Sequence, residues 1–168
     1  MTLSAGIPAD LVAQTLRTFR GVEHRIEFVR ELDGVRWIND SKGTNVDSTI
    51  QAVRAMKAPT VLILGGSPKK ANYVPLGEEI LKCPIEHIVL IGETAKEIQA
   101  ALDTVGYRNY VHAGSDFGKA LELCRSLATK GGNVLLSPAC ASFDMFDDYE
   151  ARGRIFKGMV NAMEGAED

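Results

Sequence analysis

The sequence predicts an α/β fold: a Rossmann-like three-layer sandwich with a mainly parallel sheet of about six strands and one antiparallel edge strand. Two observations carry this prediction. Short runs of β-branched and aliphatic residues alternate with amphipathic stretches along the chain, and right-handed crossovers between such units place helices on both faces of a parallel sheet. In addition, Asp33-Gly34 separates two runs with alternating apolar residues, which is a strong signal for a β-hairpin.

The hairpin is expected to join strands at residues 25–32 and 35–39, and the first of these would be the antiparallel edge strand. Further strands are expected at 60–64, 87–91, 110–112 and 134–136, and helices at 46–56, 76–82, 94–104, 116–130 and 149–163. Another helix is expected at 7–19, where Ile7, Leu11, Leu16 and Phe19 recur at helical spacing. Such a stripe is typical of a face that packs into a core.

Composition limits the function classes. The 168 residues fit one globular domain, and a formal net charge of −3 gives no basic surface for nucleic acid. The first residues lack a signal-peptide pattern, and no apolar run approaches the ~20 residues of a membrane helix, so we expect no membrane insertion. Three cysteines without CxxC spacing argue against a disulfide framework or zinc site and fit a reducing cytoplasm. We expect no metal to be held by this chain alone.

Ligands of open α/β sheets bind beyond the carboxyl ends of the strands, and the loop at residues 39–45 lies at such an end. It combines Asp40, hydroxyl groups and Lys42 in seven residues, and either Thr44 or Asn45 can cap the following helix. A helix N-terminus beside a lysine suits an anion, but a polar turn with a chance lysine would look the same. The pattern leaves both interpretations open.

Two more loops at strand ends have unusual composition. In the loop 65–70, Gly65-Gly66 would let the backbone approach a ligand, with Lys69 and Lys70 nearby; a flexible solvated turn is the alternative. The loop 137–142 consists of small residues around Cys140, which we expect to be buried packing because no histidine lies near it in sequence. Neither a P-loop nor a GxGxxG motif occurs, so a complete ATP or NAD site is not expected.

Five motifs occur in an order that resembles the C-terminal domain of the Mur ligases of peptidoglycan synthesis, most of all the members that add D-glutamate. The similarity extends over nearly the whole chain, from about residue 6 to residue 164. The motifs are GVEHRIE at 21–27, NDSKGTN at 39–45, LGG at 64–66, SPACASFDMF at 137–146 and EARG at 150–153. Each motif alone is weak evidence for this family, whereas the five motifs in this order are specific for it.

The resemblance implies an ATP-dependent carboxylate–amine ligase that phosphorylates UDP-N-acetylmuramoyl-L-alanine and joins it to D-glutamate. Such enzymes have three domains, and the resemblance covers only the third, which binds the amino acid and closes over ATP. Residues 1–20 would be the end of the central domain and the hinge, and residues 21–168 the C-terminal domain. ATP and Mg²⁺ would be held mainly by the missing central domain, so this chain alone is expected to be inactive.

The resemblance also implies residue roles. Lys42 would be the catalytic residue, at the phosphate end of the intermediate. His24, Arg25 and Asp40 would face the nucleotide, whereas the D-glutamate site would be formed by Thr44, Lys69, Ser142, Phe143 and Tyr149. The doubled lysine leaves Lys69 and Lys70 as alternatives at the substrate.

Two other hypotheses fit the same residues. The chain could be a stand-alone module that binds a small anion, because its loops suit anions and no nucleophile–base pair is evident. It could also be the same domain from a ligase that adds another amino acid or a chain of glutamates.

Overall fold

The computed structural model describes residues 6–18 and 21–165, and within it a six-stranded sheet has the order β1-β2-β6-β3-β4-β5. The strands are β1 (Glu27–Leu32), β2 (Val35–Asn39), β3 (Thr60–Gly65), β4 (Ile85–Ile91), β5 (Tyr110–Gly114) and β6 (Asn133–Leu136). β1 pairs antiparallel with β2 across the Asp33-Gly34 turn, and the other neighbours are parallel. The predicted fold class and the antiparallel edge strand are therefore confirmed.

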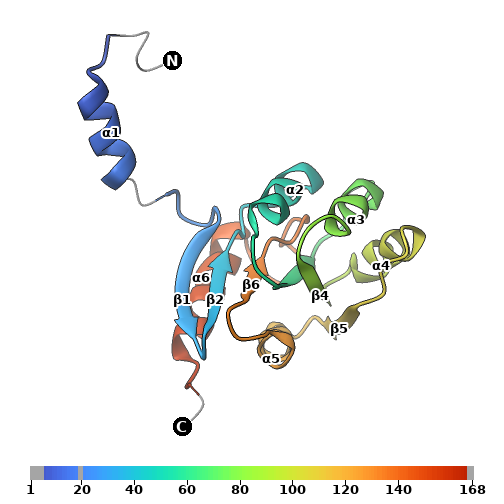
Figure 1. The fold of residues 1–168 in the computed structure, drawn as a ribbon. Coiled ribbons are helices and arrows are strands. Elements are labelled where there is room, and N and C mark those ends of the chain that lie inside the picture. Colours follow the sequence, from blue (N-terminus) through green and yellow to red (C-terminus); the bar gives the residue numbers. More distant parts are fainter. Residues whose placement is uncertain (1–5, 19–20, 166–168) are drawn as a thin grey trace.

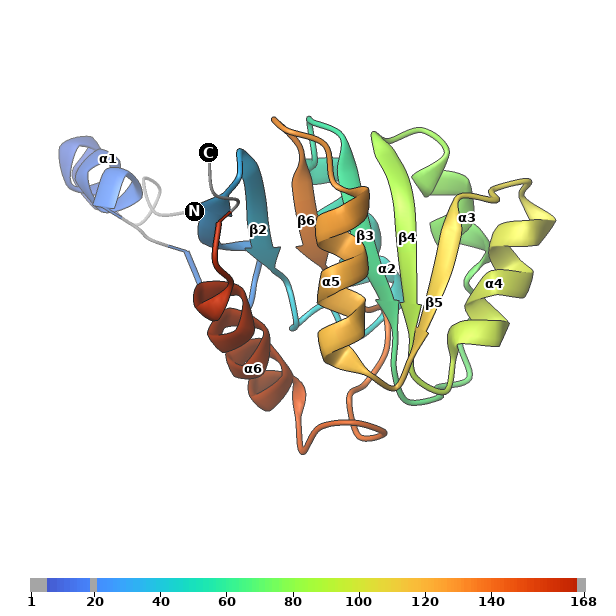
Figure 2. The same ribbon diagram turned by 90° about the horizontal axis from the view of Figure 1, so that it is seen from below.

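Helices cover both faces of the sheet, as Figures 1 and 2 show. The helices are α1 (Ala9–Thr18), α2 (Val46–Ala55), α3 (Val74–Ile80), α4 (Ala95–Thr104), α5 (Phe117–Leu127) and α6 (Tyr149–Ala162). Buried residues of α2, α3 and α4 share one hydrophobic cluster with the sheet, and those of α5 and α6 share a second cluster with its other face. Every residue of β3 and β6 is buried, as expected for central parallel strands.

Two predicted helix boundaries differ from the structure for local reasons. α3 begins two residues earlier than the predicted range 76–82, because Pro75 lies in its first turn, where the fixed φ of proline suits a helix start. The predicted range 116–130 is too long at both ends. Asp116 caps α5 by accepting from the backbone N–H of Lys119, and the helix ends at Leu127, ahead of Gly131.

α1 forms as predicted, but its apolar stripe does not join a core. Leu11 is 52% exposed and Ile7 is 38% exposed, and Figure 1 shows α1 standing away from the sheet and its helices. The side chains of Leu16 and Phe19 lie outside the described part of the chain. The expectation of a core face is therefore wrong for Leu11, because helical periodicity shows which side is apolar but not whether a partner surface is present.

No helix within the described residues is long and apolar enough to cross a membrane.

Candidate functional site

The loops after β2, β3 and β6 meet at the carboxyl edge of the sheet, because these strands are parallel neighbours. The backbone N–H of Ala139 donates to the carbonyl of Gly43 (2.9 Å), which joins the loops after β6 and β2. The N–H of Ser67 donates to the carbonyl of Ala141 (3.0 Å), which joins the loops after β3 and β6. The three loops singled out by composition thus form one continuous surface.

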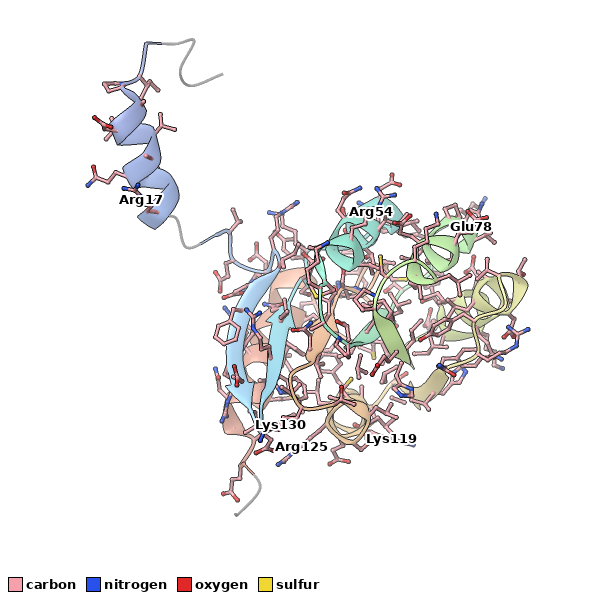
Figure 3. The ribbon with its side chains drawn as sticks, in the orientation of Figure 1. Arg17, Arg54, Glu78, Lys119, Arg125 and Lys130 are labelled. Carbon is pink, nitrogen blue, oxygen red and sulfur yellow. The ribbon has the colours of Figure 1, made fainter. Side chains whose placement is uncertain are left out.

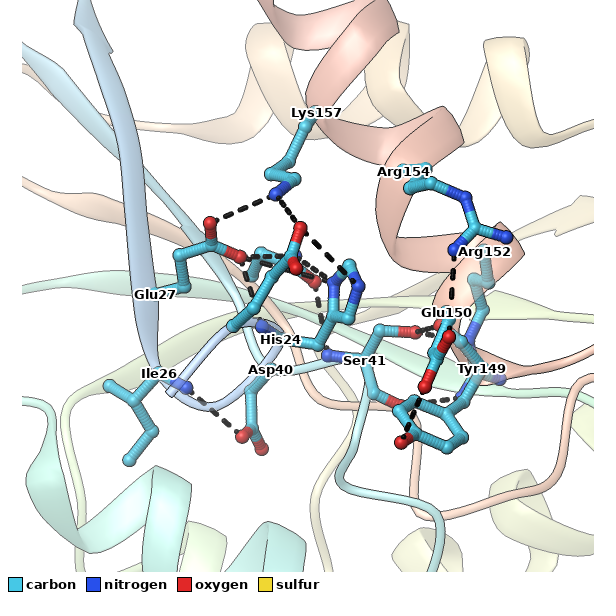
Figure 4. Close-up of polar contacts among 12 residues, drawn as sticks. His24, Ile26, Glu27, Asp40, Ser41, Tyr149, Glu150, Arg152, Arg154 and Lys157 are labelled. Atoms are coloured by element: carbon cyan, nitrogen blue, oxygen red, sulfur yellow. Dashed lines mark hydrogen bonds and ion pairs between the residues drawn. The ribbon is translucent and has the colours of Figure 1, made fainter. Parts of the chain in front are cut away.

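The buried side chain of Arg152, on α6, holds two of these loops together (Figure 4). Its Nε donates to Ser41 Oγ and its Nη2 to the Ser41 carbonyl, both at 2.8 Å, and its Nη1 donates to the Cys140 carbonyl at 3.3 Å. Burial lowers the pKa of Arg152 to about 10, and the guanidinium remains charged at neutral pH. Sequence reasoning gave this residue no role. However, Arg152 is four residues before Phe156 and eight before Val160, which places it on the same buried face of α6.

Asp40 is buried at the end of β2 and is held by two donors. Ser137 Oγ donates to its Oδ2 at 2.6 Å, and the backbone N–H of Ile26 donates to its Oδ1 at 3.2 Å. Burial raises the pKa of the Asp40 carboxyl, even though both hydrogen bonds and the nearby Arg25 favour the ionised form. A Cβ at Gly43 would lie 2.6 Å from the Asp40 carboxylate, so glycine leaves room for this arrangement.

A cavity of about 270 Å³ opens beside Asp40 and is also lined by Arg25 and Lys42. The first turns of α2 form its other wall, and Asn45 caps that helix by accepting from the N–H of Ser48 at 2.9 Å. Of the two predicted capping residues, Asn45 is therefore the one that the helix uses. The cavity lining carries two cations, Arg25 and Lys42, and two carboxylates, Asp40 and Asp47, so it suits a polar ligand that can meet charges of both signs.

His24 does not line this cavity, because its side chain is buried against α6 (Figure 4). A Cβ at Gly153 would collide with the imidazole ring. Asn39 Nδ2 lies 2.9 Å from His24 Nδ1 and also donates to Glu27 Oε2. Since the amide N–H group is a donor, Nδ1 is assigned as the acceptor and Nε2 as the protonated nitrogen.

The segment before β1 and the first residue of β1 are tied to α6 by ion pairs (Figure 4). Lys157 Nζ lies 3.0 Å from Glu27 Oε1 and 2.6 Å from Glu23 Oε1. Burial alone would raise the pKa of Glu27, but hydrogen bonds from the His24 N–H, Lys157 and Asn39 outweigh it and hold this pKa below its ordinary value. The turn that carries His24 and Arg25 is therefore anchored to the body of the domain.

The residues predicted at the amino-acid site lie on the same edge of the sheet. Lys42 Nζ is 5.7 Å from the ring centroid of Tyr149, a cation–π distance. Both Lys69 and Lys70 are exposed. Lys69 Nζ is 3.5 Å from the Thr44 carbonyl, whereas Lys70 has no hydrogen bond or ion pair to any described residue. Of the two lysines, Lys69 is thus the one that the structure joins to the loop after β2.

The last two predicted residues differ in exposure. Ser142 is buried, and Phe143 is 74% exposed. The next residue, Asp144, links the loop after β6 to the loops after β3 and β4. Ser67 Oγ donates to its Oδ1 at 3.1 Å, and the Glu93 N–H donates to its Oδ2 at 3.2 Å. Sequence reasoning gave no role to Asp144, whose partners come from two other loops.

Gly65 and Gly66 do not form a solvated turn or an open ligand-facing loop, since both are buried. A Cβ at Gly65 would collide with the Ile91 carbonyl, and one at Gly66 with the Ala141 carbonyl. Both glycines have positive φ, 120° and 146°, which favours glycine. The predicted close approach exists, but it is made to the chain's own backbone.

Cys140 is a buried residue that packs in the interior, as predicted. It is fully buried, and its Sγ lies 3.1 Å from the Tyr73 hydroxyl and 3.2 Å from Thr94 Oγ1. Burial raises the pKa of its thiol, so the thiol is protonated at neutral pH. Among the described residues, no group of three or more His, Cys, Asp or Glu side chains could hold a metal ion.

Comparison with known proteins decides the family. The profile described as "Mur ligase, glutamate ligase domain" matches residues 24–140. The chain belongs to the Mur ligase family. It corresponds to the C-terminal, glutamate ligase domain of these enzymes, as the ordered motifs predicted.

Curated relatives of this Mur ligase domain share one name, UDP-N-acetylmuramoylalanine–D-glutamate ligase. The protein of Caldicellulosiruptor bescii is 44% identical over 162 residues, which are 96% of this chain and 35% of that protein. The protein of Thermoanaerobacter sp. is 47% identical over 161 residues, 93% of this chain and 34% of that protein. The chain therefore spans about a third of the length of these relatives.

Solved structures of Mur ligases share the fold. UDP-N-acetylmuramate-alanine ligase MurC of Thermotoga maritima aligns with a TM-score of 0.63 and 17% identity over 97% of this chain and 36% of that chain. MurF ligase of the same organism, in complex with ADP, aligns with a TM-score of 0.58 and 15% identity over 95% of this chain and 36% of that chain. At these identities the likeness concerns the fold alone.

Proposed function

We propose that this chain is the C-terminal domain of the ATP-dependent ligase that adds D-glutamate to UDP-N-acetylmuramoyl-L-alanine. The observation that carries the proposal is the 44–47% identity to D-glutamate ligases over more than nine-tenths of the chain. In this role the domain positions D-glutamate and closes over ATP and the acyl phosphate. The domain orients the reacting groups and supplies charge, which lowers the activation barrier of amide formation. It supplies no proton-abstracting residue.

The cavity beside Asp40 is the proposed nucleotide side of the site. Arg25 and Lys42 supply positive charge there, and Lys42 is the proposed catalytic residue because its mobile ammonium can offset charge on a transferring phosphate. A volume of about 270 Å³ is below the ~300 Å³ at which ligand pockets begin, as expected for half of a site. His24 is proposed to act through position, since its buried ring supports the turn that carries Arg25.

The surface formed by Thr44, Lys69, Ser142, Phe143 and Tyr149 is the proposed D-glutamate site. A dicarboxylate needs cations and hydrogen-bond donors, and Lys69 and the hydroxyls of this surface supply both. The 3.5 Å contact between Lys69 Nζ and the Thr44 carbonyl supports Lys69 over Lys70 as the substrate-binding lysine. Tyr149 orients Lys42 through its ring.

The domain is proposed to start at the turn that follows α1, with residues 1–20 as the end of the central domain and the hinge. The apolar side of α1 is exposed at Leu11. This supports the division, because that side of the helix would then pack against the central domain. ATP and Mg²⁺ are then held mainly by the central domain, in the cytoplasm where ATP is available. The MurF complex with ADP supports a nucleotide as a ligand of this architecture.

The isolated chain should therefore not catalyse the ATP-dependent ligation. Incubated with ATP, Mg²⁺, UDP-N-acetylmuramoyl-L-alanine and D-glutamate, it is expected to release no phosphate above the buffer rate in a phosphate-release assay. Sustained turnover would contradict the division into a catalytic central domain and a positioning C-terminal domain.

Substrate roles are tested in the full-length ligase that contains this domain. Lys69→Ala and Ser142→Ala are expected to raise KM for D-glutamate by about tenfold, since each loses a charge-assisted hydrogen bond of roughly 1.5–3 kcal/mol, and to change KM for ATP less. Lys70→Ala is the matched control, and its KM values should stay within about twofold of the wild type. An unchanged D-glutamate KM in both variants would remove these residues from the site.

The same assay tests the choice of amino acid. D-Glutamate is expected to support turnover, and L-glutamate or meso-diaminopimelate to support little. Turnover with L-glutamate on a glutamate-terminated acceptor would instead assign the domain to a ligase that extends glutamate chains. Tight, saturable binding of a free amino acid to the isolated chain would favour the stand-alone binding module.

A further inference from the structure

Asn39 is the last residue of β2, and its fully buried side chain joins the turn before β1 to the loop after β2. Its Nδ2 lies 2.9 Å from His24 Nδ1 and donates to Glu27 Oε2 at 2.9 Å. Its Oδ1 accepts from the backbone N–H of Ser41 at 3.1 Å. The opposite amide orientation would place Oδ1 against the Glu27 carboxylate, so these contacts fix the orientation. Each amide hydrogen and the amide oxygen of Asn39 therefore has a partner of its own.

The turn before β1 has a backbone conformation that needs support from outside the turn. His24 and Ile26 have positive φ angles of 61° and 44°, which are uncommon for residues with a side chain and an outlier for β-branched isoleucine. Such conformations persist where surrounding contacts fix them. The backbone N–H of His24 donates to Glu27 Oε2 at 3.0 Å, the same oxygen that accepts from Asn39. Figure 4 shows Glu27 beside His24. The Glu27 carboxylate thus joins the strained turn to the end of β2.

Arg25 lies between the two residues with positive φ and depends on the turn for its place. Its side chain is exposed, and no hydrogen bond or ion pair joins it to any described residue. Arg25 lines the cavity beside Asp40 from the turn, and Lys42 lines it from the loop after β2. The Lys42 N–H donates to the His24 carbonyl at 3.0 Å, which joins turn and loop directly. Since the guanidinium has no contact of its own, the backbone of the turn sets where Arg25 enters the cavity.

We propose that Asn39 and Glu27 are positioning residues that hold Arg25 in place for contact with the nucleotide. This inference rests on the proposed function, because it takes the cavity beside Asp40 as the nucleotide side of the site. Neither Asn39 nor Glu27 lines the cavity, so both act through the turn and not on the ligand. Orientation of charged groups is a large part of catalysis, and a misplacement of about 1 Å costs on the order of 100-fold in rate.

Asn39→Asp tests the amide donor without a change in side-chain size. The aspartate can still accept from the Ser41 N–H, so the loop that carries Lys42 keeps this contact. On its other side, a carboxylate replaces the donor and faces the Glu27 carboxylate, and like charges at this distance repel. We therefore expect the variant to displace the turn that carries Arg25 and to leave the loop after β2 in place.

The full-length ligase that contains this domain shows the effect as a split between substrates. Asn39→Asp is expected to lower kcat/KM for ATP by about 10- to 100-fold and to leave KM for D-glutamate within about twofold of wild type. Calorimetry with ADP is expected to show a Kd raised by about tenfold, as for the loss of one charge-assisted hydrogen bond. Equal losses for both substrates, or an ADP affinity equal to that of wild type, would overturn the proposal.

Glu27→Gln is the reciprocal test. It keeps an oxygen for the Asn39 amide but loses the charge, so kcat/KM for ATP is expected to fall by about two- to fivefold. In the double variant the glutamine amide can donate to the aspartate at position 39, and at least about fivefold of the lost kcat/KM should return. A double variant no better than Asn39→Asp would overturn the pairing. Should circular dichroism show that Asn39→Asp does not fold, Glu27→Gln alone decides, and an unchanged kcat/KM for ATP would overturn the proposal.

Two control variants remove a charge without touching Asn39. Glu23→Gln removes the other partner of Lys157, and Glu23 is 62% exposed. Lys130→Gln removes an exposed cation at the opposite end of the β1–β2 hairpin (Figure 3). Both should leave kcat/KM for ATP within about twofold of wild type, and a loss as large as that of Asn39→Asp would overturn the proposal.

The wild-type enzyme separates failure of this inference from failure of the proposed function. A wild type that neither binds ADP nor ligates D-glutamate would overturn the proposed function, and this inference with it. A wild type that does both, with Asn39→Asp equally active, would overturn the positioning role of Asn39 alone.

Discussion

Replacement of Arg152 by methionine should destabilise this domain far more than a surface change on the same helix. The guanidinium makes hydrogen bonds to Ser41 Oγ and the Ser41 carbonyl at 2.8 Å and to the Cys140 carbonyl at 3.3 Å. Methionine fills similar space without a donor, so both buried carbonyls and the hydroxyl lose a charged partner. The variant thus tests whether these contacts join the loops after β2 and β6.

The expected magnitude follows from two opposing effects. Three hydrogen bonds to a charged group contribute about 6 kcal/mol at roughly 2 kcal/mol each. A pKa lowered from 12.5 to about 10 corresponds to about 3 kcal/mol of unfavourable burial of Arg152, at ~1.36 kcal/mol per pH unit. The net loss of stability is therefore about 3 kcal/mol, or a fall in Tm of roughly 6–12 °C for a domain of this size.

Urea unfolding followed by circular dichroism measures this loss as a change in the free energy of unfolding. The matched control is Arg154→Met, because Arg154 is two residues away on α6, is 58% exposed and makes a 3.6 Å ion pair with Glu150. Such a pair contributes less than about 1 kcal/mol. A loss below about 1 kcal/mol for Arg152→Met, or equal losses in both variants, would refute the reasoning.

Two further variants probe the same region. Burial raises the pKa of Asp40 above its unfolded value, so Asp40 contributes stability that is fully present below its unfolded pKa and is lost as pH rises through the folded pKa. In urea unfolding, Asp40→Asn should therefore gain stability relative to wild type between about pH 4 and pH 7; a pH-independent difference would contradict the pKa shift. Gly153→Ala should cost about 1–3 kcal/mol in thermal unfolding, because its Cβ would collide with the His24 ring. Gly158→Ala, in the same helix with nothing within 4 Å, should instead stabilise by roughly 0.5–1 kcal/mol; equal effects would count against the collision.

Much of the fold follows from local pattern. The Asp33-Gly34 turn and the alternation of strands with amphipathic helices predict the mixed sheet, because hydrophobic period and turn chemistry are local properties of the chain. The same alternation predicts which loops meet at the carboxyl edge, since parallel strands end on one side of a sheet. The residues of the candidate site came from the resemblance of five ordered motifs, and the family profile over residues 24–140 confirms that family.

Other features depend on contacts between distant parts of the chain. Arg152 and Ser41 are 111 residues apart, so no local pattern shows that this arginine is buried between two loops. The place of Lys69 beside Thr44 likewise depends on how two loops approach each other. A core tryptophan was predictable at position 37, but not that its N–H has no acceptor in the described part of the chain.

The sequence by itself determined the order of strands and helices and the edge of the sheet at which the chemistry-bearing loops lie, because spacing and turn residues act over a few positions. Only the tertiary structure decided which buried polar groups are paired. It gave Arg152 its acceptors and left the Trp37 N–H without one among residues 6–18 and 21–165. Hydrogen bonding and burial depend on which atoms come within about 3 Å of each other, and that is settled only when the layers pack.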